Sequence, residues 1–205
     1  MTTEQFTFFW GEDSPFSQWH PSPFIHSGEL YHNAEQFMMA AKAKIFHDYA
    51  TLYKIMNTHN PKLHKALGRQ VKNFNETRWF AVAQFIVYRG NIAKFSQNPK
   101  LCEILIKTIG TTLVEASPYD KIWGIGLTEN DPRSKNRSTW QGRNWLGETL
   151  TAARGDISKG LIGQCLYCTL GPNNNNICTY PTTFKSTKCL IDIKDCPNFN
   201  DIITV

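Results

Sequence analysis

Glu35 and Lys42 are the first pair of side chains whose types and spacing could do chemistry. They lie seven residues apart in a segment of strong helix formers, so both project from one face of a helix. The adjoining positions hold Met38, Met39 and Phe46, and a carboxylate and an ammonium on such an apolar face must meet a cleft or each other. In the alternative interpretation, the dipole of the first helical turn merely favours Glu35, and Lys42 is solvated.

The segment 113–126 carries a second candidate, Asp120, and an aromatic neighbour, Trp123. A short apolar run, Leu113-Val114, leads into a Ser-Pro turn, and turns display carboxylates at the surface. The glycines that follow allow a ligand to approach the backbone closely, and a tryptophan beside them can stack on a planar ring. In the alternative interpretation, Asp120 caps a short helix and Trp123 belongs to the core.

Three cations and one further tryptophan complete the candidates. Trp79 lies on the longest predicted helix, where aromatic residues usually belong to the core, and Arg69 precedes that helix. Lys94 and Arg143 could contact a phosphate, although charges at such positions are more often solvated.

Helices are the elements that must position most of these residues. Asn33 is a suitable N-cap with Gln36 three residues on, a capping-box pattern, and Asn60-Pro61 starts a helix with proline in its first position. Helices are predicted over 34–46, 48–56, 60–68, 75–96, 98–109 and 144–154. Strands are predicted at 6–10 and 113–114, with a hairpin over 24–31 that turns at Ser27-Gly28. The predicted fold class is therefore mainly α with short β-strands (α+β).

The composition indicates an ordinary folded domain. The chain has 205 residues, of which 41% are hydrophobic, and its 13 Phe, 6 Trp and 7 Tyr exclude a disordered chain. A net charge of +5 fits an anionic, phosphate-bearing ligand, whereas no block of Lys and Arg indicates a nucleic-acid-binding tail. The N-terminus lacks the pattern of a signal peptide, and no apolar run reaches the roughly 18 residues of a membrane span. We expect a cytoplasmic protein.

The end of the chain differs from the rest, so a boundary is predicted between residues 157 and 158. Five of the six cysteines follow residue 160, together with four consecutive Asn. Residues 1–157 are therefore assigned to the main domain and residues 158–205 to a Cys-containing C-terminal extension. Cys165 and Cys168 form one CxxC pair without the second pair of a zinc ribbon. Reduced cysteines are favoured over a zinc site there, and disulfides are not expected in the cytosol.

Four ordered blocks of the chain resemble the NADAR (YbiA-like) family of N-glycosidases. The first runs from Phe8-Phe9-Trp10 through Ser14-Pro15-Phe16-Ser17 to Trp19-His20-Pro21, and the second comprises Tyr31, Ala34-Glu35-Gln36-Phe37-Met38 and Ala41-Lys42-Ala43. The third comprises Leu67-Gly68-Arg69, Trp79, Asn91, Lys94-Phe95, Gln97-Asn98 and Leu101. The fourth comprises 113–127, Asp131-Pro132, Trp140, Gly142, Asn144 and Leu146-Gly147. An ordered series of this kind over residues 6 to about 155 is far more specific than a single motif.

This resemblance implies a YbiA-like helical bundle and a hydrolase that cleaves a ribose C–N bond. Members of the family are described as acting on phosphoribosylamino-pyrimidines of the early riboflavin pathway, or as removing ADP-ribose from guanine. The implied partner is thus a ribose-phosphate or ADP-ribose-containing substrate, ADP-ribosylated nucleic acid included, and no membrane partner is expected. No metal and no cofactor are implied. By motif match, the family's site falls on Glu35, Lys42, Trp79, Asp120 and Trp123.

Two departures from the family pattern bear on substrate preference rather than on activity, because both leave the carboxylates in place. Gln36 stands where the second block usually has His, and Met39 stands where Gln is common. In the first block, Ser17-Gln18-Trp19 replaces the usual Ser-Asn-aromatic sequence.

A mechanism follows by analogy with glycoside hydrolysis. Breaking a ribose C–N bond builds positive charge on the sugar and requires a proton for the leaving nitrogen, so two carboxyl groups suffice. The hypothesis assigns Glu35 to the cation and the water, and Asp120 to protonating or holding the leaving group. The substrate would be bound by Trp79 or Trp123 stacked on the base, and by Lys42 with Arg69 on the phosphate.

Two other classes of function remain open. One is a module that binds ADP-ribose or NAD without turnover, although such a module has no need of an acid opposite an anion. The other is an interaction domain whose aromatic residues all belong to the core, which predicts no thermal stabilisation by ribose phosphates.

Overall fold

The computed structural model describes residues 4–159, and the predicted mainly helical fold with short strands is confirmed. In chain order, the strands and helices are β1 (Phe6–Phe9), β2 (Phe24–His26), β3 (Glu29–Tyr31), α1 (Ala34–Ile45), α2 (Tyr49–Met56), α3 (Pro61–Arg69), α4 (Glu76–Gln97), α5 (Pro99–Ile106), β4 (Thr112–Glu115), the 3₁₀ turns η1 (Pro132–Lys135) and η2 (Arg137–Thr139), and α6 (Trp145–Ser158).

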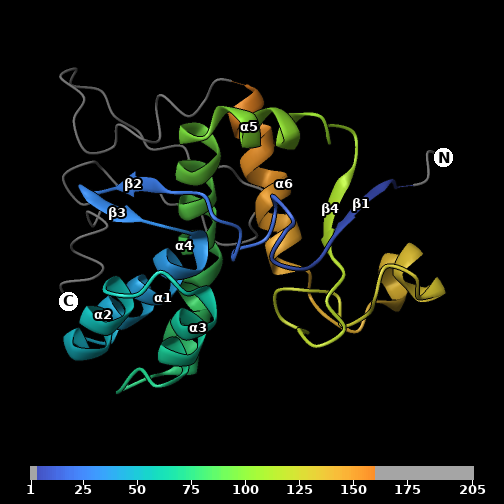
Figure 1. Ribbon diagram of the computed structural model, residues 1–205. Coiled ribbons are helices and arrows are strands. Elements are labelled where there is room, and N and C mark those ends of the chain that lie inside the picture. The colour runs from blue at the N-terminus through green and yellow to red at the C-terminus, as the bar shows by residue number, and fades with distance from the viewer. Residues whose placement is uncertain (1–3, 160–205) are drawn as a thin grey trace, which may run out of the picture.

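The long helix α4 stands at the centre, and α1, α5 and α6 contact it (Figure 1). α1 contacts α4 and is flanked by α2 and α3, whereas α6 packs along α4 and against β4. Phe37 of α1, Phe95 of α4 and Leu150 of α6 are fully buried in the core that these helices share. Burial of each such side chain stabilises the fold by roughly 1.5–3 kcal/mol. Gly90 makes the close approach of α1 and α4 possible, because a Cβ there would lie 2.6 Å from the Phe37 ring.

The strands anchor two long loops, residues 10–23 after β1 and residues 116–131 after β4. β1 and β4 pair in parallel, with Phe6 opposite Thr112 and Phe9 opposite Glu115. Because the strands are parallel, the loops that follow them leave from the same edge of this small sheet (Figure 1). β2 and β3 form the predicted hairpin, which turns at Ser27 and Gly28 with positive φ at both residues.

The start of α1 differs from the predicted capping box in one respect. Asn33 caps the helix as predicted, and its Oδ1 accepts a hydrogen bond of 2.8 Å from the Gln36 amide. The Gln36 side chain, however, accepts from the backbone N–H of His32 rather than from that of Asn33. Its Nε2 then donates to the carbonyls of Ile55 and Thr58, so Gln36 ties α1 to the chain that leaves α2.

Two helices end at residues other than the predicted ones. α6 ends at Ser158 instead of residue 154, because Ala153 and Ile157 pack against Tyr88 and Ile92 of α4. α5 ends at Ile106 rather than at residue 109, and the chain continues to Gly110 in a series of turns. Such ends are set by tertiary packing, which periodicity along the sequence does not report.

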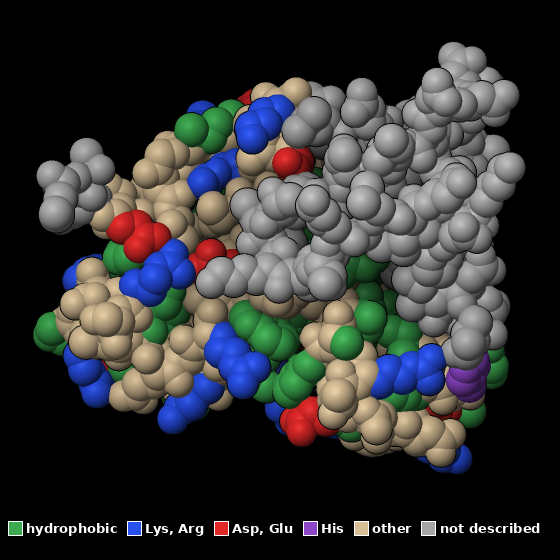
Figure 2. Space-filling model, turned by 180° about the vertical axis from the view of Figure 1, so that it is seen from behind, with side chains coloured by type: hydrophobic (Ala, Val, Ile, Leu, Met, Phe, Trp, Pro, Cys, Tyr) green, Lys and Arg blue, Asp and Glu red, His purple; other side chains and the backbone are tan. Residues whose placement is uncertain are grey.

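Charged side chains are dispersed on the one face that is viewed from behind (Figure 2). On the face shown in Figure 2, Lys and Arg side chains are scattered among polar and apolar ones and form no continuous stripe. Within residues 4–159, no helix is long and apolar enough to cross a membrane. The predicted C-terminal extension lies outside the described residues from residue 160 onward, and so do the five cysteines for which a zinc site was considered.

Candidate active site

Glu35 lies in the first turn of α1, and it is buried although it carries a carboxyl group. Its side chain is only 6% exposed, and its backbone N–H donates to the Gln18 carbonyl at 2.9 Å. Burial raises the pKa of Glu35 to about 7, and the charge of Asp120 adds to the increase. Lys65 and a hydrogen bond from Trp19 act in the opposite direction. Glu35 therefore exists in both protonation states near neutral pH, which suits a group that handles protons.

The loop that carries Trp19 is held against α4 by a buried lysine. Lys94 is fully buried, and its Nζ donates to the carbonyls of Pro15 and Ser17 at 2.8 and 2.9 Å. Burial lowers the pKa of Lys94 to about 7. The prediction that Lys94 is either a phosphate contact or a solvated charge is therefore wrong, because its ammonium group is buried and donates hydrogen bonds to two loop carbonyls. Its role is to fix the loop that places Trp19 over Glu35.

Glu115 is a second carboxyl group of the cluster, partly buried, and the sequence analysis did not single it out. It closes β4, and burial raises its pKa to about 8. The charges of Asp120 and Glu35 raise this pKa further, whereas Lys65 lowers it. Oε2 of Glu115 is buried and has no hydrogen-bond partner among the described residues. A carboxyl oxygen held in this way favours the protonated form of the group.

Asp120 lies in the turn after β4, and its two oxygens face different partners. Oδ1 accepts hydrogen bonds from the backbone N–H groups of Ile122 and Trp123, at 2.9 and 2.8 Å. Oδ2 lies 4.0 Å from Nζ of Lys65, and both side chains are partly exposed. The interpretation that Asp120 caps a short helix is wrong, because residues 121–131 form no helix and Oδ1 closes a turn of the loop instead. Oδ2 faces the cluster that contains Glu35 and Glu115.

Three cations surround these carboxyl groups. Lys65 and Arg69 lie one turn apart on α3, and both interact electrostatically with Glu35. Lys42 lies farther along α1, where burial and the nearby charge of Arg69 lower its pKa and Glu35 raises it. The Lys42 ammonium is 4.0 Å from the centre of the Phe74 ring, so an aromatic face supports it. Lys65 is the cation that sequence reasoning missed.

The two tryptophans expected to stack on a base occupy different surroundings. Trp79 is only 5% exposed and belongs to the core, with the Lys42 ammonium 5.7 Å from its ring centre. Trp123 is half-buried and packs edge-to-face against Trp145, at 5.7 Å between ring centres. Arg143, the other cation considered for phosphate, is exposed and lies over the Trp145 ring.

The structure thus brings together four of the six residues predicted for the site: Glu35, Lys42, Arg69 and Asp120. It adds Glu115, Lys65 and Trp19 to them. In the described part of the chain, no three His, Cys, Asp or Glu side chains are grouped as metal ligands. The chemistry available to the site's own residues is proton transfer and electrostatic stabilisation beside a buried carboxylate.

The chain is similar to several known proteins. "N-glycosidase R617" of Acanthamoeba polyphaga mimivirus is 43% identical over 165 residues, which cover 75% of this chain and 97% of that protein. "Riboflavin biosynthesis protein PYRR, chloroplastic" of Arabidopsis thaliana is 34% identical over 110 residues, covering 51% of this chain and 18% of that protein. The NMR structure of the Escherichia coli protein YbiA superposes with a TM-score of 0.64 at 21% sequence identity. That superposition covers 79% of this chain and 90% of YbiA, and it shows a shared YbiA-like fold. The NADAR domain matches residues 8–158, and the chain therefore belongs to the NADAR family.

Proposed function

We propose that this protein hydrolyses the N-glycosyl bond between a phosphorylated ribose and a nitrogen heterocycle. The observation that carries the proposal is the cluster of Glu35 and Glu115, two carboxyl groups whose pKa values are raised by desolvation, beside Asp120 and three cations. The 43% identity to a protein named as an N-glycosidase supports the same reaction. One carboxylate and one carboxylic acid, present at the same pH, suffice to hydrolyse this bond.

Glu35 and Glu115 divide these two roles. Glu115 holds the proton, because its Oε2 is buried without a hydrogen-bond partner among the described residues and the charge of Asp120 raises its pKa. Glu35 supplies the carboxylate, because Lys65, Arg69 and a hydrogen bond from Trp19 all favour its ionised form. As the C1–N bond breaks, Glu115 donates its proton to the leaving nitrogen, and ionised Glu35 stabilises the positive charge that builds on C1 and O4 of the ribose. Water then adds its oxygen to C1 and gives a proton to Glu35, and exchange with solvent restores both groups.

Asp120 is better suited to keep Glu115 protonated than to act as the acid itself. Its Oδ1 already accepts two backbone hydrogen bonds and its Oδ2 faces Lys65, which leaves neither oxygen placed to carry a proton to the substrate. Its negative charge raises the pKa of both Glu35 and Glu115. Asp120 is therefore a positioning residue in this scheme, and Glu115 takes the acid role that the sequence analysis gave to Asp120.

The cations hold the phosphate of the substrate. Lys42 and Arg69 carry like charges that repel one another, and this repulsion lowers the pKa of Lys42. A phosphate between them would remove this repulsion and gain charge-assisted hydrogen bonds. Trp79 lies beneath Lys42 in the core and supports its ammonium group. Trp123, half-buried in the loop after Asp120, is the predicted tryptophan that stays accessible to a substrate beside the carboxyl groups.

The substrate that we propose first is a phosphoribosylamino-pyrimidine. The similarity to a plant protein named for riboflavin biosynthesis supports this choice, because such a compound is an early intermediate of that pathway. ADP-ribose attached to guanine is the second candidate, since it presents the same ribose C–N bond and also carries phosphate.

The test is release of ribose 5-phosphate from the aminopyrimidine substrate, and of ADP-ribose from guanine-ADP-ribosylated DNA. Glu35→Gln is expected to reduce turnover about 100-fold or more, because it removes the anion that stabilises the sugar cation. Glu76→Gln is the matched control, since Glu76 also lies in the first turn of a helix but is exposed. If wild-type protein releases neither product while ADP-ribose still raises its melting temperature, the protein is a binding module instead.

A further inference from the structure

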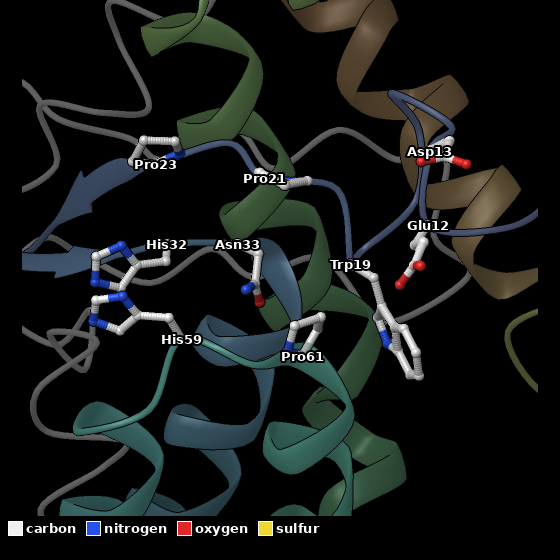
Figure 3. Close-up of a pocket in the computed structure, with 9 residues that line it drawn as sticks. All are labelled: Glu12, Asp13, Trp19, Pro21, Pro23, His32, Asn33, His59 and Pro61. Atoms are coloured by element: carbon white, nitrogen blue, oxygen red, sulfur yellow. The ribbon is translucent and has the colours of Figure 1, made fainter.

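A pocket of about 580 Å³ adjoins the carboxyl cluster and is not used by the mechanism above. It lies between the loop 12–23 and the N-terminal ends of α1 and α3, and its walls include Trp19, Asn33, His59 and Pro61 (Figure 3). Its volume is within the range of pockets that bind small molecules. Trp19 is the shared wall, because it lines this pocket and also hydrogen-bonds Glu35.

Helices α1 and α3 run side by side in the same direction away from this pocket. At their N-terminal ends, Asn33 caps α1 and Pro61 begins α3, and both residues line the pocket. Near the other end of α3, Gly68 lies directly against Met39 of α1, since a Cβ on Gly68 would fall 1.9 Å from the Met39 sulfur. Positions at equal distance from the pocket therefore face each other across the two helices.

This arrangement puts three zones in a fixed order. The pocket comes first, Glu35 in the first turn of α1 and Lys65 one turn along α3 come next, and Lys42 and Arg69 come more than two turns along. The nine residues from Asn33 to Lys42 span about 13 Å of helix. A nucleotide laid along this line would have its base in the pocket, its ribose C1 beside Glu35 and its phosphate at Lys42 and Arg69.

The lining of the pocket is suited to a flat ring that carries hydrogen-bond donors. The rings of His32 and His59 stack with 3.7 Å between their centres and form one wall (Figure 3). Glu12 and Asp13 stand on the opposite side of the pocket and supply carboxylate acceptors. These carboxylates disfavour a phosphate in the pocket, and the helix N-termini do not offset them, because the side chains of Asn33 and Asn60 already cap both helices.

We propose that this pocket binds the leaving heterocycle of the substrate, an uncharged, amino-bearing flat ring, while the phosphate lies at the far end of α1 and α3. This proposal rests on the proposed N-glycosidase function, and it adds where the two ends of the substrate lie. Amino groups of the ring would donate to Glu12 or Asp13, and the ring face would lie on the imidazole of His59.

The experiment compares the binding of AMP, which carries an aminated base, with that of ribose 5-phosphate, which carries none. Isothermal titration is performed on the full chain as wild type, His59→Ala, His59→Phe and Tyr53→Ala. Tyr53 is the matched control, because it is an exposed ring on the neighbouring helix α2 and does not line the pocket.

We expect wild type to bind AMP about tenfold more tightly than ribose 5-phosphate, because only AMP reaches the pocket. His59→Ala should weaken AMP about fivefold and leave ribose 5-phosphate unchanged, and His59→Phe should restore AMP binding through its flat ring. Tyr53→Ala should change neither affinity. The proposal is overturned if His59→Ala weakens both ligands equally or leaves AMP unaffected.

Binding and turnover are scored separately, so the two proposals can fail independently. Loss of the AMP preference in His59→Ala would support the pocket even if no N-glycosyl bond were cleaved. Conversely, if Glu35→Gln abolished turnover but His59→Ala retained full AMP affinity, the glycosidase would stand and the pocket assignment would fall.

Discussion

Replacing Glu115 by Gln should lower turnover and, at alkaline pH, raise the free energy of unfolding. The carboxyl group of Glu115 supplies the catalytic proton, but it destabilises the folded protein where it resists ionisation. Glutamine keeps the shape of the side chain but neither donates a proton to the leaving nitrogen nor becomes charged. Loss of a general acid lowers turnover by about 10²–10⁴-fold. Removal of a buried group that resists ionisation should at the same time stabilise the protein at alkaline pH.

The size of the stability effect follows from the shift in the pKa of Glu115, from 4.5 to about 8. Below pH 4.5 this carboxyl is protonated in both the folded and the unfolded chain, so its contribution to stability is fully present. As the pH rises toward 8, the unfolded chain releases this proton and the folded protein retains it, so stability is lost through this interval. At about 1.4 kcal/mol per pKa unit, the free energy of unfolding should fall by roughly 3–4 kcal/mol between pH 5 and pH 8 through Glu115 alone.

Urea denaturation at pH 5 and pH 8, with turnover measured on the same samples, tests both effects. The stability of Glu115→Gln relative to wild type should rise by roughly 3 kcal/mol from pH 5 to pH 8, while turnover stays near background. Glu76→Gln, a substitution of an exposed glutamate, should change neither quantity. A Glu115→Gln protein that keeps wild-type turnover, or that is less stable than wild type at pH 8, would refute the reasoning.

Three further predictions concern pH, phosphate binding and packing. The kcat/KM profile should be a narrow bell that rises near pH 7 as Glu35 ionises and falls near pH 8 as Glu115 loses its proton; a plateau from pH 5 to pH 9 would contradict this. Lys42→Ala should raise KM for a phosphorylated substrate at least about tenfold with little change in kcat, whereas Lys44→Ala on the same helix should not; equal effects of the two would mean that Lys42 holds no phosphate. Gly147→Ala should lower the free energy of unfolding by at least about 2 kcal/mol, since its Cβ would lie 2.1 Å from a backbone carbonyl of β4. An unchanged midpoint of urea denaturation would contradict this and would show that α6 can move away from β4.

The helical part of the site was predictable because its signals are local. Asn33 before a run of helix formers predicts where α1 begins, and the seven-residue spacing then puts Glu35 and Lys42 on one face. Asn60-Pro61 predicts the start of α3 in the same way, and the observed helix runs from Pro61 to Arg69. These residues need no knowledge of the rest of the fold to be placed.

Glu115, Lys65 and Trp19 could not be found in this way, because they reach Glu35 only through the fold. Glu115 arrives through the parallel pairing of β4 with β1, which lies more than 100 residues earlier in the chain. Lys65 is one of several lysines on short helices, and nothing in its neighbours distinguishes it. A usable signal existed for Glu115 alone: a glutamate that ends an apolar strand just before a turn bearing a second carboxylate.

Lys94 and Gln36 show why a residue's type did not predict its role. A lysine late in a long helix is normally solvated, yet Lys94 is fully buried because two carbonyls of the opening loop accept its hydrogen bonds. Gln36 departs from the usual family residue, and its amide joins α1 to the end of α2. In both cases the partners are backbone carbonyls of distant segments, and no periodic pattern in the sequence reports these.

Cleavage by this cluster requires Glu115 to be protonated and Glu35 to be ionised within the same pH range, and ¹³C NMR measures both groups directly. The protein would be labelled with [δ-¹³C]glutamate and titrated from pH 4 to pH 10, with Glu35→Gln and Glu115→Gln used to assign the two resonances. We predict one carboxyl that titrates near pH 7 and disappears in Glu35→Gln, and another that titrates near pH 8 and disappears in Glu115→Gln. If both groups titrated near the ordinary glutamate value of about 4.3, no acid would be present at neutral pH and the proposed mechanism would be wrong.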